Sequence, residues 1–253
     1  MEKIKKERVS VIGVKISNIN MDKCLKIFSD SLDDARGKYI CAANVHTTVM
    51  AHENRDYKKI QENSFLTLPD GKPLSVVGKK KGCTEMGRVT GPEFMENILE
   101  NSIQKGWTHY LYGNTEENLN LLIKYLKKKY PNLNIVGYEP SIFRELSDSE
   151  KDDLIQRINK KNPDFVWIGL GAPRQEIFCS ELSDKTNSIW VGVGGAFNVI
   201  AGTIPRAPQW MQDHGLEWLY RLMKEPKRLF KRYFVTNSKF ILYLIKDMLG
   251  EKE

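Results

Sequence analysis

Short apolar runs alternate along the chain with longer segments in which apolar residues recur every three or four positions. Runs of the first kind are typical of buried strands, and the longer spacing is typical of helices that bury one face. Their alternation favours an α/β fold with a mostly parallel sheet and flanking helices. The predicted strands are Val9–Val14, Tyr39–Asn44, Phe65–Leu68, Thr108–Tyr112, Asn134–Tyr138, Phe165–Gly169 and Ile189–Gly194.

Several predicted helices have ends that the sequence marks. Asn20 can cap one helix, and Thr115 precedes another with an acidic first turn and a basic last turn, which suits the helix dipole. Ser147 and Glu150 have the spacing of a capping box, and a further helix is predicted to begin at Pro92. The helices therefore fall between the predicted strands.

The pattern changes after Pro205, where the strand-like runs stop. Trp, Tyr, Phe and Leu then recur at helical spacing with Lys and Arg between them. We predict an α/β catalytic domain over residues 1–204 and a helical, basic appendage over residues 205–253. The whole chain has a net charge of +7, and residues 221–246 alone hold eight basic residues against one acid. The appendage is expected to meet something acidic, such as ligand phosphates, a nucleic acid or anionic lipid.

The appendage pattern is that of a basic amphipathic segment, which lies in a membrane interface rather than crossing it. Its apolar face could equally pack on the rest of the chain or against another subunit. No nucleic-acid recognition motif accompanies it. Of the 253 residues, 41% are hydrophobic and 28% are charged, no signal peptide is evident, and the four cysteines lack ligand spacing. We expect a cytoplasmic protein, peripheral on a membrane, with reduced thiols.

Five turns rich in Gly, Asn or Pro follow predicted strands. Because ligands of open parallel sheets bind beyond the carboxyl ends of the strands, these turns are the candidate site. Two of them could hold a diphosphate through backbone N–H groups, with the alternative that they are ordinary βα turns. The candidate residues in these two turns are Gly169, Gly171, Arg174, Gln175, Gly194, Gly195 and Asn198.

Three further side chains are candidates for chemistry or binding. Asp70 follows a short strand and could be a general base, although Pro-Asp-Gly is also favourable turn chemistry. Asn44 could bind a sugar hydroxyl or cap the next helix, and Arg88 could supply charge or be a surface residue. No Asp-x-Asp closes a strand, so we predict no metal site and no cofactor, and arginines with backbone amides would stabilise a leaving diphosphate.

Six blocks of this sequence resemble the WecG/TagA/CpsF glycosyltransferases of bacterial surface-polymer assembly. In chain order they span nearly the whole sequence, and the last three together are the most specific. The blocks are AANVHTTVMA, LPDGKPLS, RVTGPEFM, VWIGLGAPRQE, VGVGGAFNVIAGTIPRAP and GLEWLYRLMKEPKRLFKRY.

The resemblance implies a Rossmann-like core and an appendage that completes the active site and docks on the inner face of the cell membrane. It also implies transfer of a sugar, with inversion and without an obligatory metal, from a UDP-sugar to a polyprenyl-diphosphate-linked acceptor. Asp70 would be the base, Asn44 would hold a sugar, and Arg88 and Gln175 would line the pocket. The basic residues implied to reach the diphosphate are Arg221, Arg228 and Lys231 or Arg232.

Two positions differ from what members using UDP-N-acetylmannosamine often carry. This chain has Ala42-Ala43 where they have Thr-Pro before the asparagine, and Asn198 where they have Asp. The donor is therefore expected to be N-acetylmannosamine or a related hexose. The alternative function is an NAD-dependent oxidoreductase or epimerase, although the first βα unit lacks a Gly-x-Gly-x-x-Gly fingerprint. A non-catalytic membrane or nucleic-acid adaptor is a second alternative.

Overall fold

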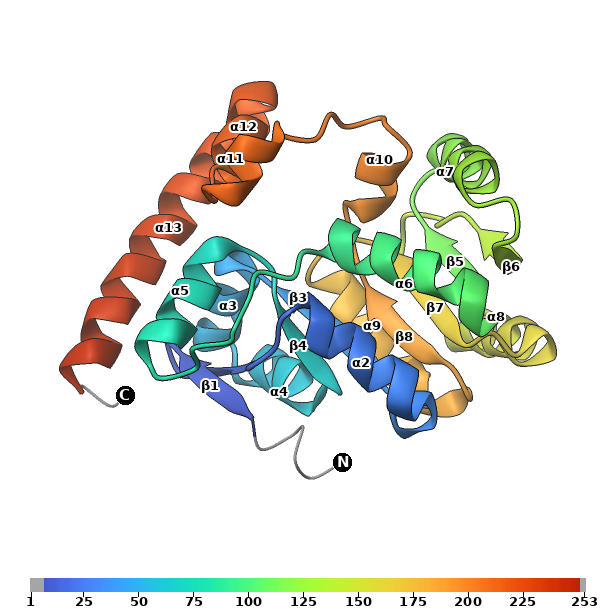
Figure 1. Ribbon diagram of the computed structural model, residues 1–253, viewed down its shortest axis with the longest axis horizontal. Coiled ribbons are helices and arrows are strands. Elements are labelled where there is room, and N and C mark those ends of the chain that lie inside the picture. Colours follow the sequence, from blue (N-terminus) through green and yellow to red (C-terminus); the bar gives the residue numbers. More distant parts are fainter. Residues whose placement is uncertain (1–6, 251–253) are drawn as a thin grey trace.

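The central feature of the computed structural model, which describes residues 7–250, is a six-stranded sheet with all neighbouring strands parallel (Figure 1). The strand order is β4-β3-β8-β7-β5-β6. The strands are β3 (Tyr39–Ala43), β4 (Leu66–Pro69), β5 (Thr108–Gly113), β6 (Asn134–Glu139), β7 (Phe165–Gly169) and β8 (Ile189–Gly192). The predicted α/β class with a parallel, Rossmann-like sheet is confirmed.

Helices cover both faces of this sheet because alternate side chains of each strand point to opposite sides. In β7, Trp167 enters one buried cluster, while Val166 and Ile168 enter the other. The first cluster includes residues of α2 (Met21–Ser31), α6 (Gly91–Lys105), α7 (Glu116–Lys129) and α10 (Ala196–Ile200). The second includes α8 (Asp148–Lys161) and α9 (Arg174–Leu182), with α4 (Arg55–Asn63) at its edge. Short 3-10 turns follow α2 and α9, at Leu32–Ala35 and Ser183–Lys185.

The marked helix ends lie where the sequence places them, within one residue. Asn20 accepts a hydrogen bond from the Lys23 N–H at 2.9 Å, and Thr115 accepts one from the Asn118 N–H at 3.2 Å. Ser147 forms both halves of its capping box with Glu150. The helix expected at Pro92 begins at Gly91, with Thr90 as its N-cap.

The first predicted strand is wrong. Instead of one strand over Val9–Val14, the chain forms an antiparallel hairpin of β1 (Arg8–Val11) and β2 (Val14–Ser17), separate from the main sheet. Ile12 and Gly13 both have positive φ, +46° and +79°, which is the backbone of a tight two-residue hairpin turn. The hairpin packs with α3 (Val45–Glu53) and α5 (Lys72–Lys80) in a third buried cluster.

The C-terminal segment forms α11 (Gln209–Asp213), α12 (Glu217–Lys224) and the long α13 (Pro226–Leu249). In Figure 1, α13 runs along the side of the molecule formed by α3 and α5. Phe240 of α13 is 5% exposed and belongs to the third buried cluster. Lys239 pairs with Glu53 at 2.7 Å, and Asp247 pairs with Lys81 at 2.6 Å. Within residues 7–250, no helix has the length and apolar character needed to cross a membrane.

Candidate active site

The carboxyl ends of the parallel strands meet at one edge, and the chain changes direction there between β5 and β7. After β5 the chain continues to β6 on one side, whereas after β7 it continues to β8 on the other side. Such a switch leaves a crevice between neighbouring turns, where α/β proteins bind ligands. The five Gly-, Asn- or Pro-rich turns therefore lie on the same edge of the sheet.

Asp70 occupies this edge directly after β4. Its backbone N–H donates to the Ala43 carbonyl at 2.7 Å, which fixes it beside the end of β3. Its carboxylate accepts a hydrogen bond from the Gly91 N–H at the start of α6. Burial raises the pKa of Asp70 to about 7, the negative charge of Glu217 adds to this, and Arg221, the Gly91 N–H and Arg88 oppose it. A carboxyl group with a pKa near neutrality is suited to general-base chemistry.

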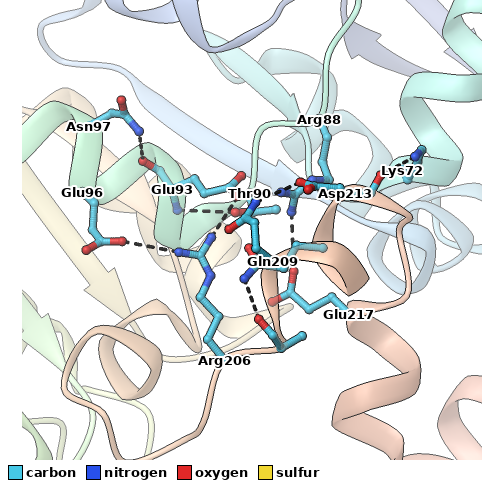
Figure 2. Close-up of polar contacts among 12 residues, drawn as sticks. Lys72, Arg88, Thr90, Glu93, Glu96, Asn97, Arg206, Gln209, Asp213 and Glu217 are labelled. Atoms are coloured by element: carbon cyan, nitrogen blue, oxygen red, sulfur yellow. Dashed lines mark hydrogen bonds and ion pairs between the residues drawn. The ribbon is translucent and has the colours of Figure 1, made fainter.

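Arg88 lies at the centre of an ion-pair network, shown in Figure 2. Its guanidinium contacts Glu93 of α6 at 2.5 Å and Glu217 of α12 at 3.5 Å. Arg206, in the segment between α10 and α11, also contacts Glu93, at 2.9 Å. These pairs join the core to the appendage. Arg88 is therefore a partly buried cation paired with two acids, and its contact with a ligand stays a prediction.

The corner between α11 and α12 rests on α5. The ammonium of Lys72 donates to the Asp213 carbonyl (Figure 2). The side chain of Lys72 also packs against Gly215. This corner directs α12 toward the glycine turn after β8, where the Arg221 guanidinium lies 3.1 Å from the position of a Cβ on Gly195. Arg221 also acts on Asp70 through its charge. The appendage thus brings Arg221 between the base candidate and a predicted diphosphate turn.

The other predicted basic residues of α13 differ in their placement. Burial lowers the pKa of the His46 imidazole at the start of α3, and the nearby positive charge of Arg232 lowers it further. Lys231 is exposed, and the side chain of Arg228 lies outside the described residues. Arg232 is therefore a basic residue of α13 that lies near His46, which is at the start of α3 two residues after Asn44.

Asn44 is the N-cap of α3. Its side-chain oxygen accepts from the Thr47 N–H at 3.1 Å, and its own N–H donates to the Thr47 hydroxyl at 2.9 Å. The capping alternative for Asn44 is therefore present in the structure. Contact between Asn44 and a sugar stays a prediction.

Gln175 connects the two glycine turns. Its side-chain oxygen accepts from the Gly171 N–H at 3.1 Å, and its amide nitrogen donates to the Glu176 carboxylate at 2.8 Å. Its amide also packs against Gly192, the last residue of β8, and against Gly194 in the turn that follows. Gln175 is 4% exposed and therefore shapes both turns from within. Arg174 is exposed and donates to the Arg144 carbonyl at 3.1 Å, away from Asp70.

Asn198 belongs to a group of amides at the crevice between β5 and β7. Its side-chain oxygen accepts from Asn114 at 2.7 Å, and its nitrogen donates to Thr203 at 3.2 Å and to Asn118 at 3.3 Å. The sequence marked the turn that contains Asn114 but did not indicate that Asn114, Asn118 and Thr203 contact Asn198. It also did not indicate Glu176 and Glu217, although they lie in the GLGAPRQE and GLEWLYR segments. Among residues 7–250, no three His, Cys, Asp or Glu side chains are grouped as metal ligands.

Comparisons with known proteins agree with this geometry. The model of the Glycosyl transferase WecG/TagA/CpsF family matches residues 9–253. An N-acetylglucosaminyldiphosphoundecaprenol N-acetyl-beta-D-mannosaminyltransferase of Bacillus spizizenii (strain ATCC 23059 / NRRL B-14472 / W23) is 28% identical over 216 residues, 85% of this chain and 81% of the relative. The transferase of the same name from Bacillus subtilis (strain 168) is 28% identical over 222 residues, 87% and 84% of the two chains. The chain therefore belongs to the WecG/TagA/CpsF family and is a glycosyltransferase.

Proposed function

We propose that this enzyme transfers a hexose, N-acetylmannosamine or a close relative, from a UDP-sugar to a polyprenyl-diphosphate-linked sugar acceptor. The proposal places it in the synthesis of teichoic acid or another bacterial surface polysaccharide. The observation that carries it is Asp70, a carboxyl group with raised pKa beside Arg221 at the carboxyl edge of the sheet. The relatives' printed name supports the acceptor class. The NAD-dependent alternative gains no support from the family match.

In the proposed reaction, the acceptor hydroxyl oxygen attacks the anomeric carbon while Asp70 takes the hydroxyl proton. The bond between that carbon and the β-phosphate oxygen breaks, and its electron pair leaves with UDP. Attack from the face opposite the leaving group inverts the anomeric configuration. Arg221, the Gly195 turn and the backbone N–H groups near Gly171 would stabilise the charge on the departing diphosphate.

The appendage is proposed to hold the enzyme on the inner face of the cell membrane. Its support is a set of large apolar side chains that α12 and α13 leave exposed, with basic residues beside them. Each basic residue close to an anionic leaflet contributes about 1 kcal/mol to binding. The exposed apolar residues are Trp218, Met223, Phe230, Phe234, Val235, Ile241, Leu242, Ile245, Met248 and Leu249.

The test is transfer by the purified full chain with a panel of UDP-sugars and a synthetic lipid-diphosphate-sugar acceptor, with product read by mass. Asp70→Asn should lower kcat by about a hundredfold or more and leave UDP affinity within about twofold of wild type, because general-base loss of this kind costs two to four orders of magnitude. Asp184→Asn, at an exposed acid in the turn before the amino end of β8 and so at the opposite edge of the sheet, is the control. Full turnover by the Asp70 variant would remove Asp70 as the base.

A further inference from the structure

The appendage brings a carboxylate as well as an arginine near Asp70. Glu217 is the first residue of α12 and lies one helical turn before Arg221. Its Oε2 is 3.5 Å from the Arg88 Nη1, and both side chains are mostly buried, with 24% and 18% exposed. Figure 2 shows Glu217 directed at Arg88 from the appendage side. An acid in this place is not needed to bind an anionic diphosphate and would repel it.

The charges around Asp70 indicate what Glu217 does. Three charged side chains act on this carboxyl group: Glu217 from α12, Arg221 from α12, and Arg88 from the segment before α6. The two arginines favour the carboxylate and would make Asp70 a weak base. Glu217 acts in the opposite direction, and it also occupies one side of Arg88 as an ion-pair partner.

We propose that Glu217 is a positioning residue for sugar transfer, acting on Asp70 through its negative charge and on Arg88 through the ion pair. The proposal rests on the function proposed above, in which Asp70 is the base. A base gains strength as its affinity for the proton rises, so an acid beside Asp70 speeds proton removal from the acceptor. Because Glu217 belongs to the appendage, the base reaches this strength only while α12 is seated on the core.

The test is the pH profile of kcat/KM for Glu217→Gln in the full-length enzyme. Glutamine keeps the size of the side chain and an oxygen that can accept from Arg88, and it removes the charge. The midpoint of the acid limb should fall by about 0.5–1 pH unit, as expected for one partly screened charge near the titrating group. The plateau should fall about two- to fivefold because the base is weaker.

Glu93→Gln is the matched control. Glu93 contacts the same Arg88, at 2.5 Å, but is not among the charged groups that act on Asp70. Its variant should keep the wild-type midpoint whatever it does to the plateau. A wild-type midpoint in Glu217→Gln, or an equal shift in both variants, would overturn the proposal.

A second measurement does not need activity. Stability is measured against pH for the wild type and Asp70→Asn, and the difference between the two curves reports the titration of Asp70. The same difference is then measured in the Glu217→Gln background, where the titration of Asp70 should occur at lower pH. If the two difference curves coincide, the proposal is overturned. Retained turnover in Asp70→Asn alone would instead overturn the proposed base, so the two failures are distinguishable.

Discussion

At the scale of single residues, the protein raises the pKa of Asp70 from 3.8 to about 7. Burial is the largest cause of this raised pKa, and Asp70 is buried because it directly follows β4. The sequence could identify Asp70 as a carboxylate at a strand end. It could not show the raised pKa, because two of the groups that act on this carboxyl, Glu217 and Arg221, belong to α12, far away in the chain.

The pH dependence of activity follows from this pKa. A general base works as the carboxylate, so kcat/KM should rise with pH through about 7 and then level off. The measurement is initial transfer rates at subsaturating acceptor between pH 5 and 9. A profile that is already flat at pH 5 would contradict it.

The free energy of unfolding should fall with rising pH, in the opposite direction to the activity. The Asp70 pKa is about 7 in the folded enzyme and about 3.8 in the unfolded chain, so the folded state binds more protons between these values. Stability therefore falls as pH rises through this window. Asp70→Asn removes this loss and should stabilise the enzyme at pH 8 by roughly 2 kcal/mol, about half the full linkage value, because Asp70 keeps an intermediate exposure that screens its charge. At pH 4 the two proteins should unfold at nearly the same temperature.

Glu176 is a second buried carboxyl group, 1% exposed, and its pKa is raised to about 7 by burial. Its carboxyl oxygen accepts from the Gln175 amide nitrogen and so holds that amide where its oxygen accepts from the Gly171 N–H. Glu176→Ala should therefore weaken UDP binding about tenfold, since leaving the buried Gln175 amide without its acceptor costs roughly 1–3 kcal/mol. Glu176→Gln retains an acceptor and should bind UDP normally. Calorimetric titration with UDP separates the two variants.

At the scale of elements, the apolar pattern predicted the six strands of the main sheet and the ends of several helices, because both depend on local sequence. The first strand was wrong because Ile12, a β-branched residue, is an unusual choice for a turn with positive φ. Only Gly13 in that run signals a turn. Strand order could not be predicted, since the sequence does not say which neighbour each strand pairs with.

The turn after β8 gives a test at this scale. Gly194 has φ +51°, and a Cβ there would lie 3.1 Å from the Gln175 side-chain oxygen. Gly194→Ala should cost about 1 kcal/mol of stability from backbone strain and also displace Gln175, which weakens UDP binding. Gly106→Ala is the control, because Gly106 has φ +71° and no neighbouring atom within 4 Å. Equal UDP affinity in the two variants would show that Gln175 does not shape the donor site.

At the scale of the whole molecule, α13 has two unlike faces. Phe240 is buried in the cluster that includes α3, whereas Phe234 is 67% exposed and stacks on Phe230, which is 61% exposed. The sequence showed an amphipathic segment but left open what covers its apolar residues. In the structure, the core covers Phe240. The proposed membrane contact is made by the other face of α13, which carries Phe234.

Two phenylalanine substitutions in the same helix separate these roles. Phe240→Ala should destabilise the folded enzyme by about 3 kcal/mol, because it leaves a cavity in a buried cluster. Phe234→Ala should leave the melting temperature nearly unchanged but reduce binding to vesicles that contain anionic lipid, since it removes apolar surface from the interface. Melting curves and vesicle sedimentation of the two full-length variants make the comparison. If Phe234→Ala sediments with vesicles as wild type does, this face of α13 does not contact lipid, and the proposed role of the appendage is confined to Arg221 and Glu217 beside Asp70.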